Sequence, residues 1–543
     1  MNAITGTATL VRLALRRERV RLPIWVAAPA LLVALQAANI ASTYPAEEDR
    51  IAATRLLAAN PGLRLLRGPA ANSSLGALTF SDAFWIIAVL AALMSVWVVV
   101  RHTRQDEESG RGEMIASAAV GPYASLAAAV GVAVTADLVL AGLTALGLVV
   151  SGLPVAGSAA TGLAIGASGI AFAGIAAVAV QLASSARTAT ALSLAALGAA
   201  YLLRGIGDAL GRVEDDGLTV TSAWPSWLSP LGWAQQVQAF EANKWWLLAL
   251  PAALATATVA IGVALAGRRD HGLGIFTDPG GPAAAPRSLL SPWGLAWRLQ
   301  RGVLLGWAVA MVIVGAVVGS LGQQIEDLAR NARLVELLTA LGGAGVDLSD
   351  TFYAALLTLI GAIVAGFPLQ AMLRANGEES AGRLEHVLAT AVGRTRWIAG
   401  HITCAVVGTL VLLLVLGGVA GLGDGLVTGE PAARLITLSA AALVQAPAIL
   451  VLTGAAVAAI AFLPRSAGAV VWAGLTVAIL LGPIGGVVDL PGAVRDLSPF
   501  THVPPAPAAD IPAAPLLALL ALAALLTTAG LIRFAHRDLA LPA

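Results

Sequence analysis

The stretch FSDAFWIIAVLAALMSVWVVV, residues 80–100, contains a single charged residue, Asp82. An apolar run of about 20 residues is long enough to cross the roughly 30 Å hydrocarbon core of a bilayer as a helix. The length and close spacing of such runs favour helices over a barrel, whose strands alternate in segments of about ten residues. The sequence therefore predicts an all-α integral membrane protein with about 12 transmembrane helices, the others lying at residues 22–41, 123–150, 155–183, 188–208, 246–267, 302–322, 351–372, 398–420, 433–463, 466–486 and 514–534.

The composition of the 543 residues supports this assignment. Apolar residues make up 58% of the chain and charged residues 12%, about half of the charged share of an ordinary soluble domain, so a water-soluble protein is excluded. The basic start, MNAITGTATLVRLALRRERVRL (residues 1–22), is followed by no small-residue cleavage site, so we expect a retained first helix instead of a removed signal peptide. Arginines concentrate in alternate loops, which predicts that both termini are cytosolic. The net charge of +1 gives no indication of nucleic-acid binding.

An internal repeat divides the chain into two halves. DEESGRGEMIASAAVG (Asp106–Gly121) aligns without a gap with EESAGRLEHVLATAVG (Glu378–Gly393). Both copies fall on the predicted cytosolic side, which favours two parallel six-helix repeats. We expect a first half at residues 1–266 with a loop at 101–121, a cytosolic linker at 267–292, and a second half at 293–543 with a loop at 373–396.

The repeated loops are candidates for a docking surface. Leu384, Val387, Leu388, Ala391 and Val392 recur on one helical face, and the first copy keeps this pattern, so each loop is predicted to contain a short amphipathic helix on the membrane surface. Glu107 and Arg111, like Glu379 and Arg383, stand at i and i+4 and are expected to pair. The alternative is that these are solvated loop charges, but two matching copies favour contact with a cytosolic partner. The candidate docking residues are Asp106, Glu107, Arg111, Glu113, Glu378, Glu379, Arg383 and Glu385.

The chain contains no ATP-binding motif. A phosphate-binding loop of the Walker type needs a lysine, and the single lysine, Lys244, stands between Asn243 and Trp245. Any ATP-driven function must therefore use an ATPase on another polypeptide. The six histidines are scattered and there is one cysteine, Cys404, so the sequence predicts no metal site, no catalytic site and no cofactor of its own.

Asp137, Arg204 and Asp208 are charged residues that fall inside apolar runs. Asp137 lies near the middle of the third run, where an acid costs about 2.5–3.5 kcal/mol on insertion scales. It could contact cargo or a proton, and a neutral Asp bonded to a neighbouring helix is an equal alternative. The matching position of the second half holds Thr409. Arg204 and Asp208 stand one turn apart and are expected to pair.

At these residues the chain resembles the ABC-2 type permeases known as exporters of polyketide antibiotics, in which two six-helix halves are fused. The resemblance is carried by the two acidic-Gly-Arg-x-Glu loops, by ANPGLRLLRG (residues 59–68), by YLLRGIGD (residues 201–208), and by the paired Leu-Ser-Pro segments at 228–230 and 497–499. It implies a type V ABC exporter in the bacterial plasma membrane that moves hydrophobic antibiotics, drugs or lipids outward.

The resemblance also implies roles for particular segments. An amphipathic helix would precede the first span of each half, at residues 7–21 and 293–301. The two loops would be coupling helices that meet two copies of a separate cytosolic ATPase subunit, which binds ATP and Mg²⁺. Aromatic residues near the second and eighth spans could line the cargo path, although a lipid-interface belt explains them equally well; these are Phe84, Trp85, Phe352 and Tyr353.

Two other functions stay open at this point. A proton-coupled drug transporter with 6+6 helices would use Asp137, its only good evidence. A non-transporting assembly or envelope-stress component that senses peptides would leave cellular drug tolerance unchanged on deletion. The scarcity of intramembrane charge argues against the proton-coupled transporter.

Overall fold

The computed structural model describes residues 3–270, 272–276, 284–321, 348–487 and 490–539. These residues form two compact units, Met1–Gly281 and Pro282–Ala543. The centre of the predicted linker, residues 277–283, lies outside the described residues. Twelve described helices are long and apolar enough to cross a membrane, and each coincides with one of the predicted spans, which confirms the all-α membrane fold.

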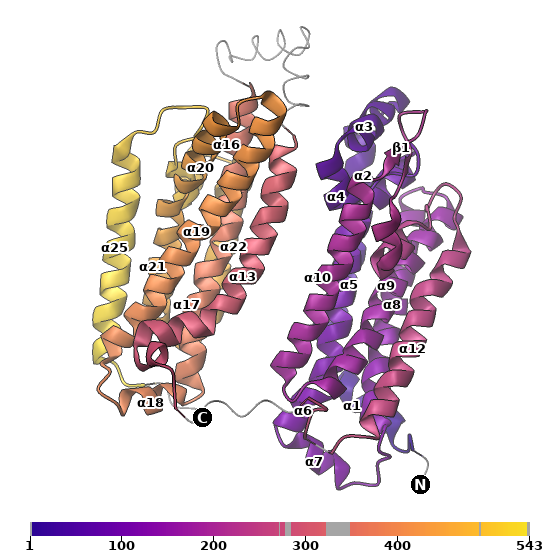
Figure 1. Ribbon diagram of the computed structural model, residues 1–543, viewed down its shortest axis with the longest axis horizontal. Helices are drawn as coiled ribbons and strands as arrows, with labels where there is room; N and C mark the ends of the chain where they lie inside the picture. Colours follow the sequence, from indigo (N-terminus) through magenta and orange to yellow (C-terminus); the bar gives the residue numbers. More distant parts are fainter. Residues whose placement is uncertain (1–2, 271, 277–283, 322–347, 488–489, 540–543) are drawn as a thin grey trace. The chain divides into compact units, whose positions relative to one another are not determined.

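Unit 1 contains the first six spans and several short elements between them (Figure 1). Its only described strands form a two-stranded antiparallel ribbon. The elements are α1 (Thr7–Arg17), α2 (Arg21–Thr43), α3 (Glu47–Ala59), α4 (Pro61–Arg67), α5 (Leu75–Arg101), α6 (Arg104–Glu108), α7 (Arg111–Ala116), α8 (Ala124–Val150), α9 (Val155–Leu182), α10 (Ala186–Ala209), β1 (Arg212–Val213), β2 (Val220–Thr221), η1 (Trp224–Leu228), α11 (Pro230–Gln235), η2 (Trp245–Leu248) and α12 (Ala249–Ala266).

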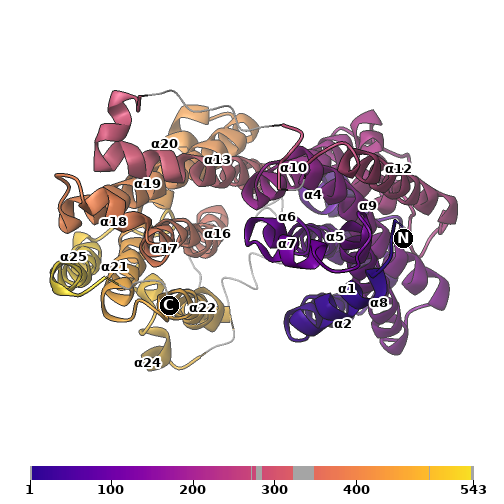
Figure 2. The same ribbon diagram turned by 90° about the horizontal axis from the view of Figure 1, so that it is seen from below.

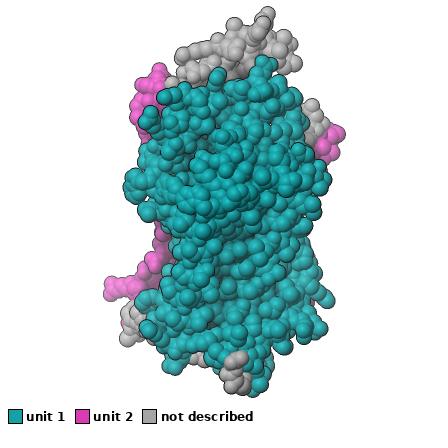
Figure 3. All heavy atoms as spheres, turned by 90° about the vertical axis from the view of Figure 1, so that its right-hand side faces the viewer, with its two compact units in different colours: residues 1–281 teal, residues 282–543 magenta. Residues whose placement is uncertain are grey.

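The core of unit 1 is built around α5, which packs against α2, α8, α9 and α10 (Figure 2). Close approach of α8 and α9 depends on the absence of a side chain at two positions of α9. A Cβ at Gly162 would lie 2.2 Å from the Ala141 carbonyl oxygen, and one at Gly166 would lie 2.9 Å from the Asp137 carbonyl oxygen. Small residues at such contacts are typical of helix packing inside membranes. Figure 3 shows one outer face of unit 1 in teal.

Unit 2 contains the other six spans. The elements are η3 (Arg287–Leu290), α13 (Pro292–Gly319), α16 (Leu348–Val364), α17 (Gly366–Ser380), α18 (Arg383–Leu388), α19 (Arg394–Thr428), α20 (Pro431–Leu443), α21 (Ala446–Phe462), α22 (Ala467–Leu481), α23 (Pro483–Val487), α24 (Gly492–Arg495), η4 (Pro499–His502) and α25 (Ala513–His536). Within this unit α13 packs along α19, and α21 packs along α25.

The helices that precede the first span differ between the units. In unit 1 the separate helix α1 ends at Arg17, before α2 begins at Arg21. In unit 2 residues 293–301 are the first part of the continuous helix α13, so the expectation of a separate helix there is wrong. Ser291 begins α13 by accepting a hydrogen bond from the Gly294 amide, and Pro292 occupies the first turn, where its missing N–H costs nothing.

Candidate functional site: the two acidic loops

The acidic loop of unit 1 is held to the helix α1 by Asp106. Arg17 donates two hydrogen bonds to the Asp106 carboxylate, at 2.7 and 3.0 Å. Arg111 donates a third from Nε, at 3.0 Å. Hydrogen bonds to an ionised carboxylate are stronger than neutral ones, and the bonds that Arg17 donates to Asp106 raise the pKa of the Arg17 guanidinium.

The carboxylate of the next residue, Glu107, forms an ion pair with an arginine that follows the last span of the unit. We call such a residue a closing arginine. Arg269, three residues after α12, donates from Nη1 and Nη2 to the Glu107 carboxylate at 3.0 and 2.5 Å. Arg104 contacts the same carboxylate at 2.5 Å. The Arg269 Nε also donates to the side chain of Gln181 on α9. The loop is thereby linked to both α12 and α9.

The loop of unit 2 repeats part of this arrangement. Arg383 donates to both oxygens of Glu378, at 2.6 and 3.1 Å, as Arg111 donates to Asp106. The second cation on Glu378 is Arg374 of the same helix, at 3.1 Å. Within the described residues, Glu378 therefore has no counterpart of the bond that ties Asp106 to α1, the helix before the first span.

Glu379 forms an ion pair with an arginine that follows the last span of unit 2. Arg537, directly after α25, donates two hydrogen bonds of 2.6 Å to the Glu379 carboxylate. Both side chains are buried, with 5% and 2% of their surface exposed. The Arg537 carbonyl in turn accepts a bond from Arg394 at the start of α19. Figure 1 shows α18 beside the lower end of α25.

The predicted pairing of Glu107 with Arg111, and of Glu379 with Arg383, is wrong. Gly110 and Gly382 adopt left-handed conformations, with φ of 72° and 71°, so the helix is interrupted between each acid and arginine and the i, i+4 geometry is lost. The short helices α7 and α18 also end earlier than predicted. Ala391 and Val392 lie beyond Leu388, the last residue of α18.

Sequence reasoning missed the two closing arginines, Arg269 and Arg537. Each stands in the short basic segment that directly follows the last span of its half. This shared position directly after the last span was the one signal in the sequence that could have identified both arginines.

Each loop also presents charge outward. Glu113 on α7 and Glu385 on α18 are exposed, and their carboxylates have no hydrogen bond or ion pair within the described part of the chain. Arg111 and Arg383 are 47% and 57% exposed even though each contacts an acid. The hydrogen bond to Glu378 raises the pKa of Arg383.

Apolar grooves lie next to these charges. In unit 1 a groove of about 550 Å³ runs between α1 and α7 and is lined by Leu10, Leu13, Met114 and Ile115. In unit 2 a groove of about 440 Å³ is lined by residues that include Glu385, Leu388 and Val392. An apolar groove with a charged rim has the composition of a protein interface.

The aromatic residues predicted for a cargo path lie in both units, with Phe84 and Trp85 in unit 1 and the rings of Phe352 and Tyr353 in edge-to-face contact in unit 2. Phe84 and Tyr353 are buried within their units, whereas Phe352 is 37% exposed and Trp85 is half-buried. The Tyr353 hydroxyl donates to Asp424 at 2.8 Å. Their role in cargo transport stays a prediction.

Asp137 is fully buried between helices of unit 1. Ser95 of α5 donates to its Oδ2 at 2.6 Å. A Cβ at Gly169 of α9 would lie 2.1 Å from Oδ1, so α9 closes over the carboxyl group. This surrounding fits a carboxyl group that packs between helices, and its functional role stays a prediction.

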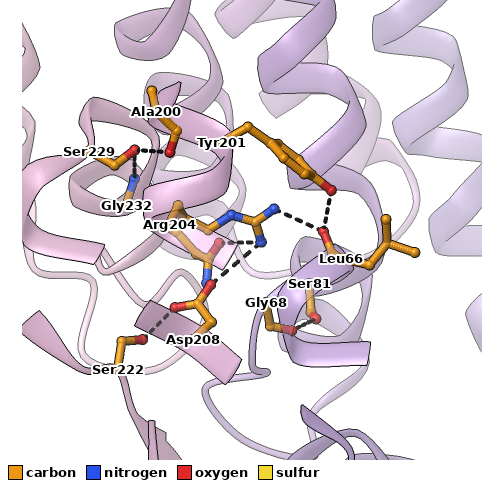
Figure 4. A network of polar contacts seen from close by, with 11 residues as sticks. Leu66, Gly68, Ser81, Ala200, Tyr201, Arg204, Asp208, Ser222, Ser229 and Gly232 are labelled. Atoms are coloured by element: carbon orange, nitrogen blue, oxygen red, sulfur yellow. Dashed lines mark hydrogen bonds and ion pairs between the residues drawn. The ribbon is translucent and has the colours of Figure 1, made fainter. Parts of the chain in front are cut away.

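The predicted pair of Arg204 and Asp208 is confirmed, at 3.5 Å, as part of a larger network (Figure 4). Arg204 donates to the Leu66 carbonyl at 2.8 Å, and Gln235 donates to Asp208 at 2.9 Å. Ser222 donates to the other oxygen of Asp208 at 2.6 Å. The network joins the segments 59–68 and 201–208, both of which the sequence had singled out.

Comparison with known proteins identifies relatives along the full chain. Residues 289–535 match a family described as the C-terminal domain of the multidrug efflux system permease Rv1217c. The multidrug efflux system permease protein Rv1217c of Mycobacterium tuberculosis (strain ATCC 25618 / H37Rv) is 39% identical over 539 residues, which cover 99% of this chain and 96% of that protein. Twelve apolar helices, two matched acidic loops and this full-length similarity agree: the chain is a multi-pass membrane protein and belongs to the family of the efflux permease Rv1217c.

Proposed function

We propose that this chain is the permease subunit of an ATP-driven ABC exporter that moves hydrophobic compounds, such as drugs and antibiotics, out across a bacterial plasma membrane. Two copies of a separate cytosolic ATPase subunit supply the energy, with ATP and Mg²⁺ bound by those subunits. The printed name of the relative, a multidrug efflux permease, supports the transport part of the proposal. The absence of a Walker lysine in the sequence supports a separate source of energy.

The observation that carries the proposal is the matched construction of the two loops. Each places an exposed, unpaired glutamate on a short helix, Glu113 or Glu385, and each is closed by an arginine from beyond the last span. Charge that is exposed on a firmly held helix suits recognition of a partner, because little ordering is needed on binding. Two such surfaces in one chain fit two copies of one partner.

The test is ATP-dependent accumulation of a hydrophobic dye in inside-out membrane vesicles from cells that produce the full complex. We expect the double variant Glu113→Lys, Glu385→Lys to lower the initial rate at least tenfold and to stop ATPase copurification. A matched control, Glu48→Lys with Glu430→Lys, reverses two exposed acids outside the loops and should leave both unchanged. Dye transport by the purified chain in liposomes, driven by a pH gradient without any ATPase, would falsify the proposal.

A further inference from the structure

A small cavity lies at the end of unit 1 opposite the acidic loop. Its volume is about 180 Å³, and it is lined by the segment after α4, by β2, and by the chain between η1 and η2. Figure 1 places β1, the partner strand of β2, at the other end of unit 1 from α6 and α7. The lining segments from β2 to η2 connect the fifth and sixth spans, so the cavity lies where these two helices reach the membrane surface.

Three residues that line the cavity have side-chain donors without a hydrogen-bond partner among the described residues: Gln236, Gln238 and Lys244. Lys244, the single lysine of the chain, is exposed and forms no ion pair with a described residue. The Gln236 Nε2 atom is buried and has no hydrogen-bond partner among the residues that the structure describes. The nearest acid along the chain, Glu241, is occupied by a hydrogen bond from Asn72. A buried donor without a partner favours a ligand that supplies acceptor oxygens.

Neighbouring polar groups are already committed. The Gln235 side chain accepts from Arg204 at 3.2 Å and donates to Asp208 at 2.9 Å. Ser222 also donates to Asp208, as Figure 4 shows. These bonds commit Gln235 and Ser222 and leave Gln236, Gln238 and Lys244 as the lining donors that can receive an anion.

The loop that carries Lys244 is held in an unfavourable backbone conformation. Gln238, Phe240 and Asn243 have positive φ values of 53°, 66° and 44°. Three such residues other than glycine in one short loop are rare, and backbone strain of this kind clusters at functional sites. The Phe240 ring is seated against Gly76 and Gly157, where a Cβ would lie within 2.4 and 2.1 Å of ring atoms. The lysine is therefore presented by a loop that the surrounding helices hold in place.

One exposed tryptophan lines the cavity and two more follow Lys244 in the chain. Trp227 lines it, and Trp245 and Trp246 directly follow Lys244; all three side chains are exposed. Exposed tryptophans at the ends of spans mark the level of lipid headgroups. The cavity is smaller than the roughly 300–1,000 Å³ typical of sites that enclose a drug-sized molecule. These two features favour a lipid headgroup over an entire cargo molecule.

The second half does not repeat this chemistry. With Leu228-Ser229-Pro230 aligned on Leu497-Ser498-Pro499, proline stands at the positions of all three glutamines of the cavity and alanine at the position of the lysine. Proline side chains cannot donate a hydrogen bond. The site is therefore specific to unit 1.

We propose that this cavity binds the phosphate group of an anionic phospholipid, with Lys244 and Gln236 donating to the phosphate oxygens and the acyl chains lying along the tryptophans. Lysine recognises phosphate as a point charge, and its exposure at the membrane interface lets the headgroup enter while the chains stay in the bilayer. The proposal depends on the membrane fold alone and is independent of how transport is energised.

The test is titration of the delipidated full-length protein with phosphatidylglycerol, with bound lipid counted by native mass spectrometry. We expect Lys244→Glu to weaken binding at least tenfold, Gln236→Leu to weaken it about threefold, and Lys244→Arg to stay within twofold of the unchanged protein. Arg212→Glu, on the neighbouring strand β1, is the charge control and should have no effect. Soluble glycerol phosphate should not compete, because it lacks the chains that contact the tryptophans.

Several results would overturn the proposal. Equal losses in Lys244→Glu and Arg212→Glu would mean that general surface charge attracts the lipid. Unchanged binding in both Lys244→Glu and Gln236→Leu would place the lipid elsewhere. Competition by glycerol phosphate at the concentration of the lipid would mean a site for a soluble anion. Gln236→Leu keeps the lysine and tests the cavity even if the charge reversal disturbs the loop.

Discussion

The acidic loops of the two units share one contact and differ in another. Both are closed by an arginine from beyond the last span, as Glu107–Arg269 and Glu379–Arg537. Among the described residues, only the loop of unit 1 is also tied to a helix that precedes the first span, through Asp106 and Arg17. The closing pair is therefore the common requirement, and attachment to a preceding helix is a property of the first half alone.

Helix continuity explains the difference. In unit 1 the helix is interrupted between α1 and α2. Three contacts hold α1 and the residues before it against the loop region: the pair of Arg17 and Asp106, and hydrogen bonds from the backbone amides of Gly121 and Tyr123 to the carbonyls of residues 5 and 3. In unit 2 the corresponding residues belong to α13, which needs no such anchor because its own backbone hydrogen bonds continue into the span. The four predictions that follow test this comparison.

The largest expected effect is on the closing pairs. Arg537→Met leaves the buried Glu379 carboxylate without its bidentate partner and should lower the free energy of unfolding by about 3–5 kcal/mol. Arg269→Met should cost less, about 2–3 kcal/mol, because Arg104 still contacts Glu107. Unfolding of the purified protein in mixed detergent micelles measures both.

The control for these variants is Arg16→Met, an exposed arginine of α1, with an expected change within about 0.5 kcal/mol. If Arg269→Met costs as much as Arg537→Met, the contribution of Arg104 is refuted.

The second prediction concerns the anchor of α1. Arg17→Gln removes a charged pair with Asp106 and should cost about 1–2 kcal/mol locally, seen as faster amide hydrogen exchange over residues 7–17. The matched change in unit 2, Arg374→Gln, should not accelerate exchange over residues 292–301, because they belong to a continuous helix. Equal acceleration in both places would remove the proposed distinction.

The third prediction tests what the loops share. Gly110→Ala and Gly382→Ala place a side chain on a left-handed residue with open space around it, so only backbone strain opposes them. Each substitution should lower the free energy of unfolding by about 1 kcal/mol, and the loss should be the same in both units. Gly377→Ala, also in open space but with helical φ, is the control and should be neutral or slightly stabilising in the same unfolding assay.

The smallest effect is expected at Asp137. Asp137→Thr gives the first half the residue that the second half has at Thr409, whose hydroxyl donates to the Ala405 carbonyl of its own helix. We expect a stability change below about 1 kcal/mol and dye efflux within twofold of the unchanged protein. Loss of efflux in a correctly folded variant would instead favour a proton-coupled mechanism.

The spans could be predicted from sequence because a long apolar window is a local property of the chain. The pair of Arg204 and Asp208 was equally accessible, since one unbroken helix brings residues four apart onto one face. The acidic loop of unit 1 does not form one unbroken helix. At Gly110 a positive φ separates two short helices where the residue pattern predicts a single one. A simple count of four residues therefore gave the wrong partner.

The closing contacts could not be predicted for a different reason. Glu107 and Arg269 are 162 residues apart, and Glu379 and Arg537 are 158 residues apart. No local pattern encodes a pair at that distance, because it depends on how six helices pack. The cavity near Lys244 has the same origin, since its lining comes from several segments of unit 1 that only the fold brings together.

The long separation within each closing pair has a consequence for biosynthesis. A ribosome that adds about 5–20 residues per second needs roughly 10–30 s to advance from Glu107 to Arg269. During this interval Glu107 can already pair with Arg104, which stands three residues earlier in the chain. The contact with the arginine after the last span, Arg269 in unit 1 and Arg537 in unit 2, forms only when the last helix of that unit has been synthesised, so neither loop is complete before its own unit is.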